Sequence, residues 1–346
     1  MELYPGSRLD GLLELTDETG ILQHTKFTIM DRRFGYSTDD NARALLAAIR
    51  HLKIFKREEA LRLAKTYLTF LLHMHREDGR YHNFLGYNRE YQDRVGTDDS
   101  LGHSLWALGE TMNSGSTDEM RKLAKWLFDN SLPQARKSTS PRARASALLG
   151  LAEYLKANPN DDNVKDNIFF FANHLVDQYH LESDTDWRWF EAYLTYANPR
   201  IPQSLLEAYC LTAKEEYLEV SRESLDFLIN IQFVDAVFQP VGNESWYYKD
   251  GEKSKYDQQP IEASCMVDSA VKLGEISQES KYFDIAANAF RWYYGQNTEN
   301  VSLINYNNFT CYDGLTREGL NLNQGAESTI SYYLAYYKLK QYGLIP

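Results

Sequence analysis

Cysteines are scarce in this sequence of 346 residues. The three that occur, Cys210, Cys265 and Cys311, are odd in number and far apart, so they predict neither a disulfide framework nor a CxxC metal site. No apolar run approaches the roughly 18 residues of a membrane-spanning helix. The start of the sequence lacks the basic residues and the apolar stretch of a secretory signal peptide. Reduced thiols and no targeting segment together predict a cytoplasmic protein.

Basic residues are also in short supply. Lys and Arg number 37 against 49 Asp and Glu, which gives a formal net charge of −12. This balance argues against nucleic acid and against an anionic membrane surface as partners, because both need a basic face. No GxxxxGK[ST] phosphate loop, GxSxG elbow or GxGxxG fingerprint occurs. His73 and His75 would face different sides of a helix. We therefore expect no cofactor and no metal.

Aromatic residues, by contrast, are abundant at 14 % of the sequence, with 25 Tyr, 16 Phe and 6 Trp. Many of them lie in polar, loop-like stretches such as residues 186–191 and 244–249. Amphipathic rings beside Asp, Glu, Asn and Gln suit an uncharged polar ligand that has flat apolar faces. A sugar is such a ligand.

One design recurs six times along the chain: a polar, often acidic start followed by an apolar stretch rich in Ala, Ser and Leu. The six starts, separated by 43 to 66 residues, are Thr38, Thr97, Ser140, Asn198, Asp257 and Asn323. Helices that are apolar nearly all round are buried. One-sided amphipathic helices are expected between them, over residues 57–76, 118–132, 163–181, 214–232 and 279–296, with 9–22 as a broken sixth.

Six buried helices alternating with six amphipathic ones predict an all-α fold, an (α/α)6 toroid that forms one domain over residues 1–346. The alternative is an open helical solenoid, which near-identical short repeats would favour. These repeats differ in length and carry long individual loops, which favours the closed toroid. Short β-hairpins are expected near residues 79–81 and 237–239.

Paired carboxylates at two of the six starts are the sharpest chemical signal. Thr38-Asp39-Asp40 and Thr97-Asp98-Asp99 each read as a threonine N-cap followed by two acids. Such acids stabilise the positive end of a helix dipole without any catalytic role. The same triplet at two neighbouring helix starts, however, would bring four carboxyls to one end of the toroid. Two carboxyls with separated pKa values are what glycoside hydrolysis requires.

Further candidates follow from the same reasoning. Glu262 and Glu327 occupy corresponding positions in two repeats, and Pro260 suits the first position of a helix. Glu191 stands beside two tryptophans that would desolvate it and raise its pKa. The candidate catalytic residues are Asp39, Asp40, Asp98, Asp99, Glu191 and Glu262. The candidate substrate-binding residues are Tyr36, Arg43, His82, Asn83, Trp187, Arg188, Trp189, Trp246, Gln258, Gln259 and Glu327.

At these residues the sequence resembles the six-hairpin (α/α)6 glycosidase-like superfamily. The strings GYSTDDNARAL (35–45), VGTDDSLGHSLWALG (95–109), YDQQPIEA (256–263) and GAEST (325–329) are similar to those of a bacterial glycosidase-like domain that occurs alone or joined to glycosyltransferases. In some families of this superfamily an adjacent Asp-Asp pair supplies the catalytic carboxylates. The resemblance covers essentially the whole chain and implies carbohydrate chemistry, with a glycosyltransferase as an expected partner.

Three functions remain open on this basis. The first is a glycoside hydrolase that acts on a neutral oligo- or polysaccharide, since uronates usually require Arg or Lys clamps. The second is a sugar epimerase, which would need histidine acid/base groups; His103 is the histidine nearest an inner-helix start. The third is a non-catalytic glycan-binding module of a glycan-synthesis system. An isoprenoid cyclase is disfavoured because neither DxDD nor DDxxD occurs.

Overall fold

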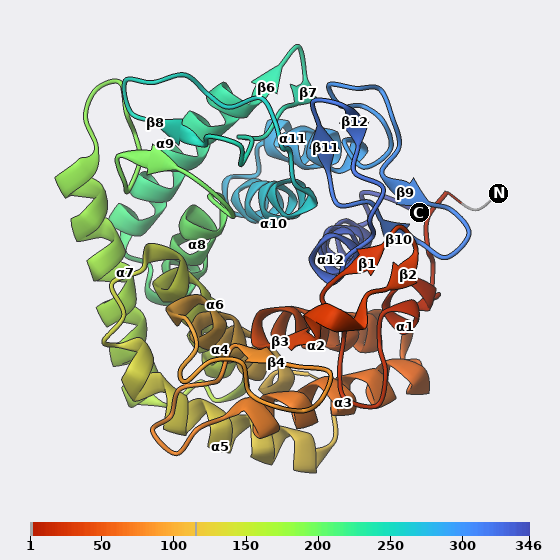
Figure 1. Cartoon of the computed structure of the whole chain (residues 1–346). Helices are drawn as coiled ribbons and strands as arrows, with labels where there is room; N and C mark the ends of the chain where they lie inside the picture. Colours follow the sequence, from red (N-terminus) through yellow and green to blue (C-terminus); the bar gives the residue numbers. More distant parts are fainter. Residues whose placement is uncertain (1–2, 115) are drawn as a thin grey trace.

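A ring of six inner helices forms the centre of the molecule (Figure 1). The computed structural model describes residues 3–114 and 116–346. The inner helices are α2 (Thr38–Phe55), α4 (Asp98–Met112), α6 (Pro141–Ala157), α8 (Arg200–Thr212), α10 (Pro260–Ser277) and α12 (Ala326–Gln341). Each packs against the next, and α12 packs against α2, so the ring is closed. The predicted (α/α)6 toroid is confirmed.

A second layer of helices surrounds this ring. It consists of α1 (Asp10–Glu14), α3 (Glu58–Met74), α5 (Asp118–Ala135), α7 (Asp162–Glu182), α9 (Glu215–Gln232) and α11 (Ser280–Arg291). Their apolar stripes pack on the inner helices as the amphipathic pattern predicts. In the segment 9–22 only five residues are helical, because the chain turns back where Asp17 N–H bonds to Gly20 O. None of the helices in the described residues combines the length and hydrophobicity that a bilayer crossing requires.

The inner helices are apolar all round because they have neighbours on every side. In α10 every residue from Pro260 to Gly274 is buried. Small residues permit the closest approaches: a Cβ on Gly109 of α4 would overlap the carbonyl of Gly150 in α6. This explains why small residues such as Ala, Gly and Ser recur among the large apolar residues of the inner helices.

Strands occur only as antiparallel pairs of two residues each in the described part of the chain. They are β1 (Thr25–Lys26) with β2 (Ile29–Met30), β3 (Tyr36–Ser37) with β4 (Phe84–Leu85), β5 (Tyr193–Leu194) with β8 (Tyr247–Tyr248), β6 (Phe233–Val234) with β7 (Val237–Phe238), β9 (Ile304–Asn305) with β10 (Thr310–Cys311), and β11 (Leu315–Thr316) with β12 (Gly319–Leu320). The hairpin expected near 237–239 is present, whereas near 79–81 a single bridge joins His75 to Tyr81.

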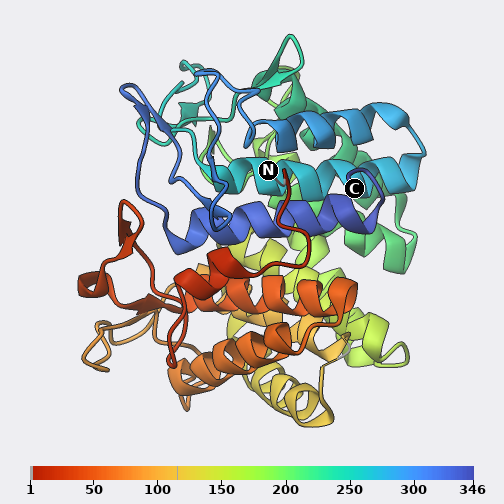
Figure 2. The ribbon, with the colours of Figure 1, turned by 90° about the vertical axis from the view of Figure 1, so that its right-hand side faces the viewer.

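The strands and long loops gather at one end of the toroid, where the inner helices begin (Figure 2). We call this end, formed by the first turns of the six inner helices, the N-terminal mouth, and the opposite end the C-terminal mouth. Thr97 and Ser140 cap their helices as predicted. The cap of α2 is Ser37 rather than Thr38, because the Ser37 hydroxyl accepts the N–H of Asp40. Helices α8, α10 and α12 begin two or three residues later than predicted.

Candidate active site

Side chains at the N-terminal mouth connect neighbouring inner-helix starts around the ring. Because the six inner helices run in the same direction, these contacts bring residues from all parts of the chain together. The contacts are Arg43 to Glu327 (2.7 Å), Asp39 to His103 (2.9 Å), Asp99 to Ser140 (3.2 Å), Arg142 to Asn198 (2.9 Å) and the Ala197 N–H to Glu262. The predicted convergence of the six starts is confirmed.

The two Thr-Asp-Asp triplets are not in equivalent positions. Since α2 is capped by Ser37 and α4 by Thr97, Asp39 and Asp99 both occupy the second position of their helices. Asp40 therefore occupies the third position, and Asp98 the first. Successive helical residues are rotated by about 100°, so the two members of each pair point in different directions.

Asp39 and Asp99 each contact a side chain of the next inner helix or its cap. The Asp39 carboxylate contacts His103 Nδ1 at 2.9 Å, and His103 lies one turn beyond Asp99 on α4. Burial alone would raise the pKa of Asp39, but the hydrogen bond and charge of His103, aided by Arg43, lower it. Asp99 accepts hydrogen bonds from the hydroxyls of Ser140 and Tyr196. Burial and the charges of Asp99 and Asp39 raise the pKa of Tyr196.

Asp40 belongs to a buried ion-pair chain instead. Its carboxylate contacts the Arg43 guanidinium at 3.0 Å and accepts the Ser37 hydroxyl at 2.7 Å. Arg43 in turn contacts Glu327 of α12 at 2.7 Å. Burial raises the pKa of Asp40, Arg43 opposes the rise, and Glu327 adds to it. The predicted contact of Arg43 with a neighbouring carboxylate is thus present.

Asp98 points away from the other three acids. It pairs at 2.8 Å with Arg80, which lies in the loop after α3. Burial would raise the pKa of Asp98, but hydrogen bonds from Ser138 and Arg80 lower it. The expectation that all four aspartates share one space is therefore wrong for Asp98, because its helix position rotates it toward the outer loops.

Glu262 is the most perturbed carboxyl at the N-terminal mouth. It is 2 % exposed, and burial raises its pKa to about 8 against the opposing effects of the Ala197 N–H and Arg142. One of its oxygens accepts the Ala197 N–H, while the other has no hydrogen-bond partner among the described residues. A buried polar atom without a partner is rare. With a pKa of about 8, Glu262 holds a proton near neutral pH, and one of its oxygens, unbonded within the described part of the chain, is free to contact a ligand.

Glu191 is buried, as its tryptophan neighbours predict, but its carboxylate is occupied by Arg142 at 2.7 Å. Arg142 also donates to the carbonyl of Tyr196 and to the side chain of Asn198. Arg142 occupies the second position of α6, the same position as Asp39 and Asp99 in their helices. It ties the loop before α8 to the start of α6.

Three aromatic residues predicted to bind substrate are in the core instead. Tyr36 and Trp189 are fully buried, and Trp187 is 4 % exposed. Trp187 packs on Phe227 and Tyr247 and donates its indole N–H to the carbonyl of Glu191. The expectation fails because these rings pack inward, Trp187 over α9 and Tyr36 on Phe70 of α3. Only Trp246 of the four is partly exposed.

Some of the remaining predicted binding residues are bonded within the fold, and others are partly exposed or lack a hydrogen-bond partner in the described part of the chain. Gln258 is fully buried and bonded on both sides of its amide, so the prediction is wrong for it. Arg188 lies 3.9 Å from Glu223 on the outer helix α9, so it is also misassigned. His82 stacks on Tyr91 at 3.9 Å. Asn83 is buried, and its side-chain oxygen has no partner among the described residues. Gln259 is the N-cap residue of α10 and is partly exposed.

Known structures share this architecture. A sugar epimerase from a ruminal bacterium superposes with a TM-score of 0.76 at 13 % identity, covering 98 % of both chains. An α-mannanase of glycoside hydrolase family 76 from Bacteroides thetaiotaomicron gives 0.71 at 12 % identity, over 97 % of this chain and 93 % of that one. An α-1,6-mannanase from Salegentibacter sp. gives 0.64 at 12 % identity, over 96 % and 97 %; it is an inactive variant with two consecutive aspartates replaced by alanine, bound to α-1,6-mannotetrose.

The chain has the six-hairpin (α/α)6 fold that these solved structures share. No protein-family model and no curated protein matches the sequence. At such low identities the similarity establishes the toroid and leaves the reaction to be argued from the side chains.

Three residues of this toroid site escaped the sequence reasoning as site members: Arg142, Tyr196 and Asp313. Arg142 follows Ser140-Pro141, a recognisable cap and first position, so its placement could have been found by aligning caps rather than acids. Tyr196 has no local signal, because only the loop path brings it to Asp99. Asp313 accepts the Gly325 N–H at 2.6 Å, and burial raises its pKa.

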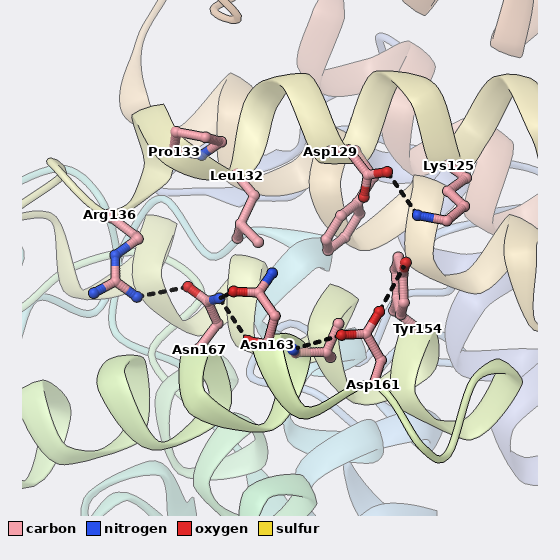
Figure 3. A pocket seen from close by; sticks show the side chains of 11 residues that line it. Lys125, Asp129, Leu132, Pro133, Arg136, Tyr154, Asp161, Asn163 and Asn167 are labelled. Atoms are coloured by element: carbon pink, nitrogen blue, oxygen red, sulfur yellow. Dashed lines mark hydrogen bonds and ion pairs between the residues drawn. The ribbon is translucent and has the colours of Figure 1, made fainter.

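In two cavities elsewhere in the molecule, the polar side chains that line the space are paired with one another. At the C-terminal mouth a cavity of about 490 Å³ is lined by residues of all six inner helices, where Lys53 pairs with Glu110 and Lys156 with Glu207. Cations there also offset the negative ends of the helices. A groove of about 360 Å³ between α5 and α7 is crossed by a hydrogen bond of 2.7 Å from Arg136, at the end of α5, to Asn167 of α7, while Lys125 and Asp129 pair with each other on α5 (Figure 3).

Proposed function

We propose that this protein is a glycoside hydrolase that acts on a neutral oligo- or polysaccharide at the N-terminal mouth. The observation that supports this most is the separation of carboxyl pKa values at the N-terminal mouth. Burial raises the pKa of Glu262 to about 8, whereas His103 and Arg43 lower that of Asp39. Near neutral pH one carboxyl is thus protonated while another is ionised, as glycoside hydrolysis requires.

In this proposal Glu262 is the general acid. Its carboxyl proton would pass to the glycosidic oxygen as the bond to the departing sugar breaks. Asp99 or Asp39 is the second carboxylate, acting on the opposite face of the sugar either on a water molecule or directly on the anomeric carbon. Tyr196, which donates to Asp99, orients that carboxylate.

The charges at the mouth favour a neutral sugar over a uronate. A carboxylated substrate needs an arginine or lysine that is free to pair with it. Arg43 is occupied by Asp40 and Glu327, and Arg142 by Glu191. The net charge of −12 would also repel an acidic polymer.

The mannanase similarity lends further support. Replacing two consecutive aspartates accompanies inactivity in the Salegentibacter enzyme. This chain contains two such pairs at inner-helix starts, Asp39-Asp40 and Asp98-Asp99. The proposal assigns the function to one member of each pair, Asp39 and Asp99, on the basis of their helix positions.

A sugar epimerase is the second candidate, and the Asp39–His103 contact of 2.9 Å favours it. A carboxylate that holds an imidazole orients the ring, which is useful for moving a proton at a sugar carbon. Structural similarity to a sugar epimerase agrees with this reading. The epimerase would use His103 as its acid/base group, whereas the hydrolase would use Glu262.

The test compares Asp99→Asn with Asp98→Asn, a matched control one residue away in the same triplet. Purified protein is incubated with α-1,6-linked mannooligosaccharides and β-1,4-linked cello-oligosaccharides, and both new reducing ends and epimerised residues are measured. A hydrolase should release reducing ends and lose roughly 10²–10⁴-fold of kcat/KM in Asp99→Asn and Glu262→Gln. Asp98→Asn should retain activity within a few-fold.

The outcomes separate the two candidates. Epimerised sugar without cleavage, lost in His103→Asn and retained in Glu262→Gln, would replace the hydrolase by the epimerase. Equal losses in Asp98→Asn and Asp99→Asn would contradict the assignment by helix position.

A further inference from the structure

Four aromatic side chains form a partly exposed surface next to the candidate active site. We call Tyr193, Tyr196, Trp246 and Tyr248 the aromatic band. Tyr193, Tyr196 and Tyr248 are 37 %, 36 % and 56 % exposed, so part of each ring is open to a ligand. Tyr193 and Tyr248 lie with ring centroids 5.9 Å apart, and Tyr196 and Trp246 with centroids 6.4 Å apart.

The aromatic band is continuous with the carboxylates. Tyr196 donates its hydroxyl to Asp99, and the guanidinium of Arg142 lies 4.9 Å from the centre of the Tyr196 ring. Tyr193 neighbours Glu191, whose charge raises the pKa of the phenol. A ligand held at Asp99 would therefore meet Tyr196 first and the rest of the band next.

The backbone holds this surface in place. Strand β5 pairs with β8 so that Tyr193 stands directly opposite Tyr248, and their neighbour Leu194 is fully buried beneath. The ladder continues with the Lys249 N–H bonding to the carbonyl of Ala192 at 2.9 Å. The rings therefore lie on a surface anchored to the core.

Trp246 adopts a backbone conformation that costs energy. Its φ is +58°, a left-handed value that a residue with a bulky side chain rarely adopts. Two backbone hydrogen bonds maintain it, from Trp246 N–H to Gly242 O at 3.2 Å and from Ser254 N–H to Trp246 O at 2.9 Å. Such strain persists where the surroundings over-determine it, and it is found preferentially at functional sites.

We propose that the aromatic band binds the non-reacting sugar units of a neutral oligosaccharide, so that the protein prefers chains over short sugars. The flat apolar faces of sugar rings pack on partly exposed aromatic faces, while phenol and indole groups remain available for hydrogen bonds. The cross-strand pair of Tyr193 and Tyr248 would also stabilise the ladder by itself. That role, however, accounts neither for Trp246 nor for the continuity with Asp99.

This inference rests on the proposed function for the reacting sugar unit, and binding is therefore measured apart from turnover. The Glu262→Gln background keeps any ligand intact. Isothermal titration is carried out with α-1,6-linked mannooligosaccharides and β-1,4-linked cello-oligosaccharides, from disaccharide to hexasaccharide. Tyr248→Thr removes the ring and keeps a residue type that favours strands, and Trp246→Ala removes the indole while keeping the Cβ at the positive φ. Trp126→Ala is the control, since Trp126 is 51 % exposed on the outer helix α5.

In the Glu262→Gln background we expect affinity to rise with chain length in one of the two series. Tyr248→Thr and Trp246→Ala should each lower hexasaccharide affinity by roughly three- to ten-fold, the range of a lost aromatic contact, with little effect on the disaccharide. Trp126→Ala should have no effect. Thermal melts of each variant verify that the fold is retained.

Affinity independent of chain length, equal losses in Trp126→Ala, or no binding of either series would each overturn the inference. Failure of the proposed function gives a different result. A protein that neither hydrolyses nor epimerises these sugars, yet binds longer chains more tightly through the aromatic band, would retain the inference and lose the catalytic proposal.

Discussion

The buried carboxyl of Glu262 makes a prediction about stability that can be tested without a substrate. Its pKa is about 8 in the folded protein, compared with an ordinary value of 4.5. Between these two values the folded chain retains a proton that the unfolded chain has released. The free energy of unfolding therefore falls as the pH rises through this window.

The magnitude follows from the size of the shift. Each pKa unit corresponds to about 1.4 kcal/mol, so Glu262 should cost the folded state about 5 kcal/mol between pH 4.5 and pH 8. Its 2 % exposure means that solvent screening reduces this value little. Glu262→Gln carries no charge at any pH. The variant should lose this part of the pH dependence while keeping the hydrogen bond from Ala197 to the side-chain oxygen.

The assay is urea-induced unfolding of both proteins at pH 5, 6, 7 and 8. The stability of Glu262→Gln relative to the parent should increase by several kcal/mol across the series. Asp98→Asn is the control, because the pKa of Asp98 is lowered and its stabilising contribution is fully present throughout this range. Parallel pH curves for the parent and Glu262→Gln would refute the reasoning and leave Glu262 ionised near neutral pH.

Two further predictions concern the scaffold. Arg50 and Lys53 lower the pKa of the buried Glu110 to about 2, so its stabilisation is present above pH 4.5 and is lost as the pH falls toward 2. Glu110→Gln should thus cost about 3 kcal/mol at pH 7 in urea unfolding and converge with the parent near pH 2; a constant difference would contradict this. Gly109→Ala should lower stability by about 1–3 kcal/mol or more, because the added Cβ overlaps the Gly150 carbonyl, and an unchanged melting temperature would show that α4 and α6 can separate freely.

The architecture was predictable because it depends on patterns that repeat along the chain. Helices surrounded by neighbours on all sides must be apolar all round, and outer helices must be amphipathic, so the alternation of the two types predicts a ring with a second layer. Helix starts were predicted best where the cap is a hydroxyl residue, as at Thr97 and Ser140. The predicted starts of α8 and α12 were less accurate, because the side chains of their cap residues make no capping hydrogen bond.

The identity of the acids at the mouth was predictable, but their orientation was not. Both Thr-Asp-Asp triplets look alike in the sequence, yet a hydroxyl one residue earlier, that of Ser37, shifts the start of α2. This single-residue shift rotates Asp39 into the position that Asp99 has in α4. Sequence alone could not show it, since both serine and threonine are good caps.

The sequence by itself determined the toroid, the end at which polar groups gather and the residue types available there. The tertiary structure decided which acids are paired, which is protonated and which rings are exposed. Charge and exposure depend on neighbours that are distant in sequence: Arg80 turns Asp98 away, burial among α8 and α10 keeps a proton on Glu262, and the packing on α9 removes Trp187 from the surface. Such contacts arise only when the ring closes, because pKa values and solvent exposure are properties of the packed surroundings rather than of the residue.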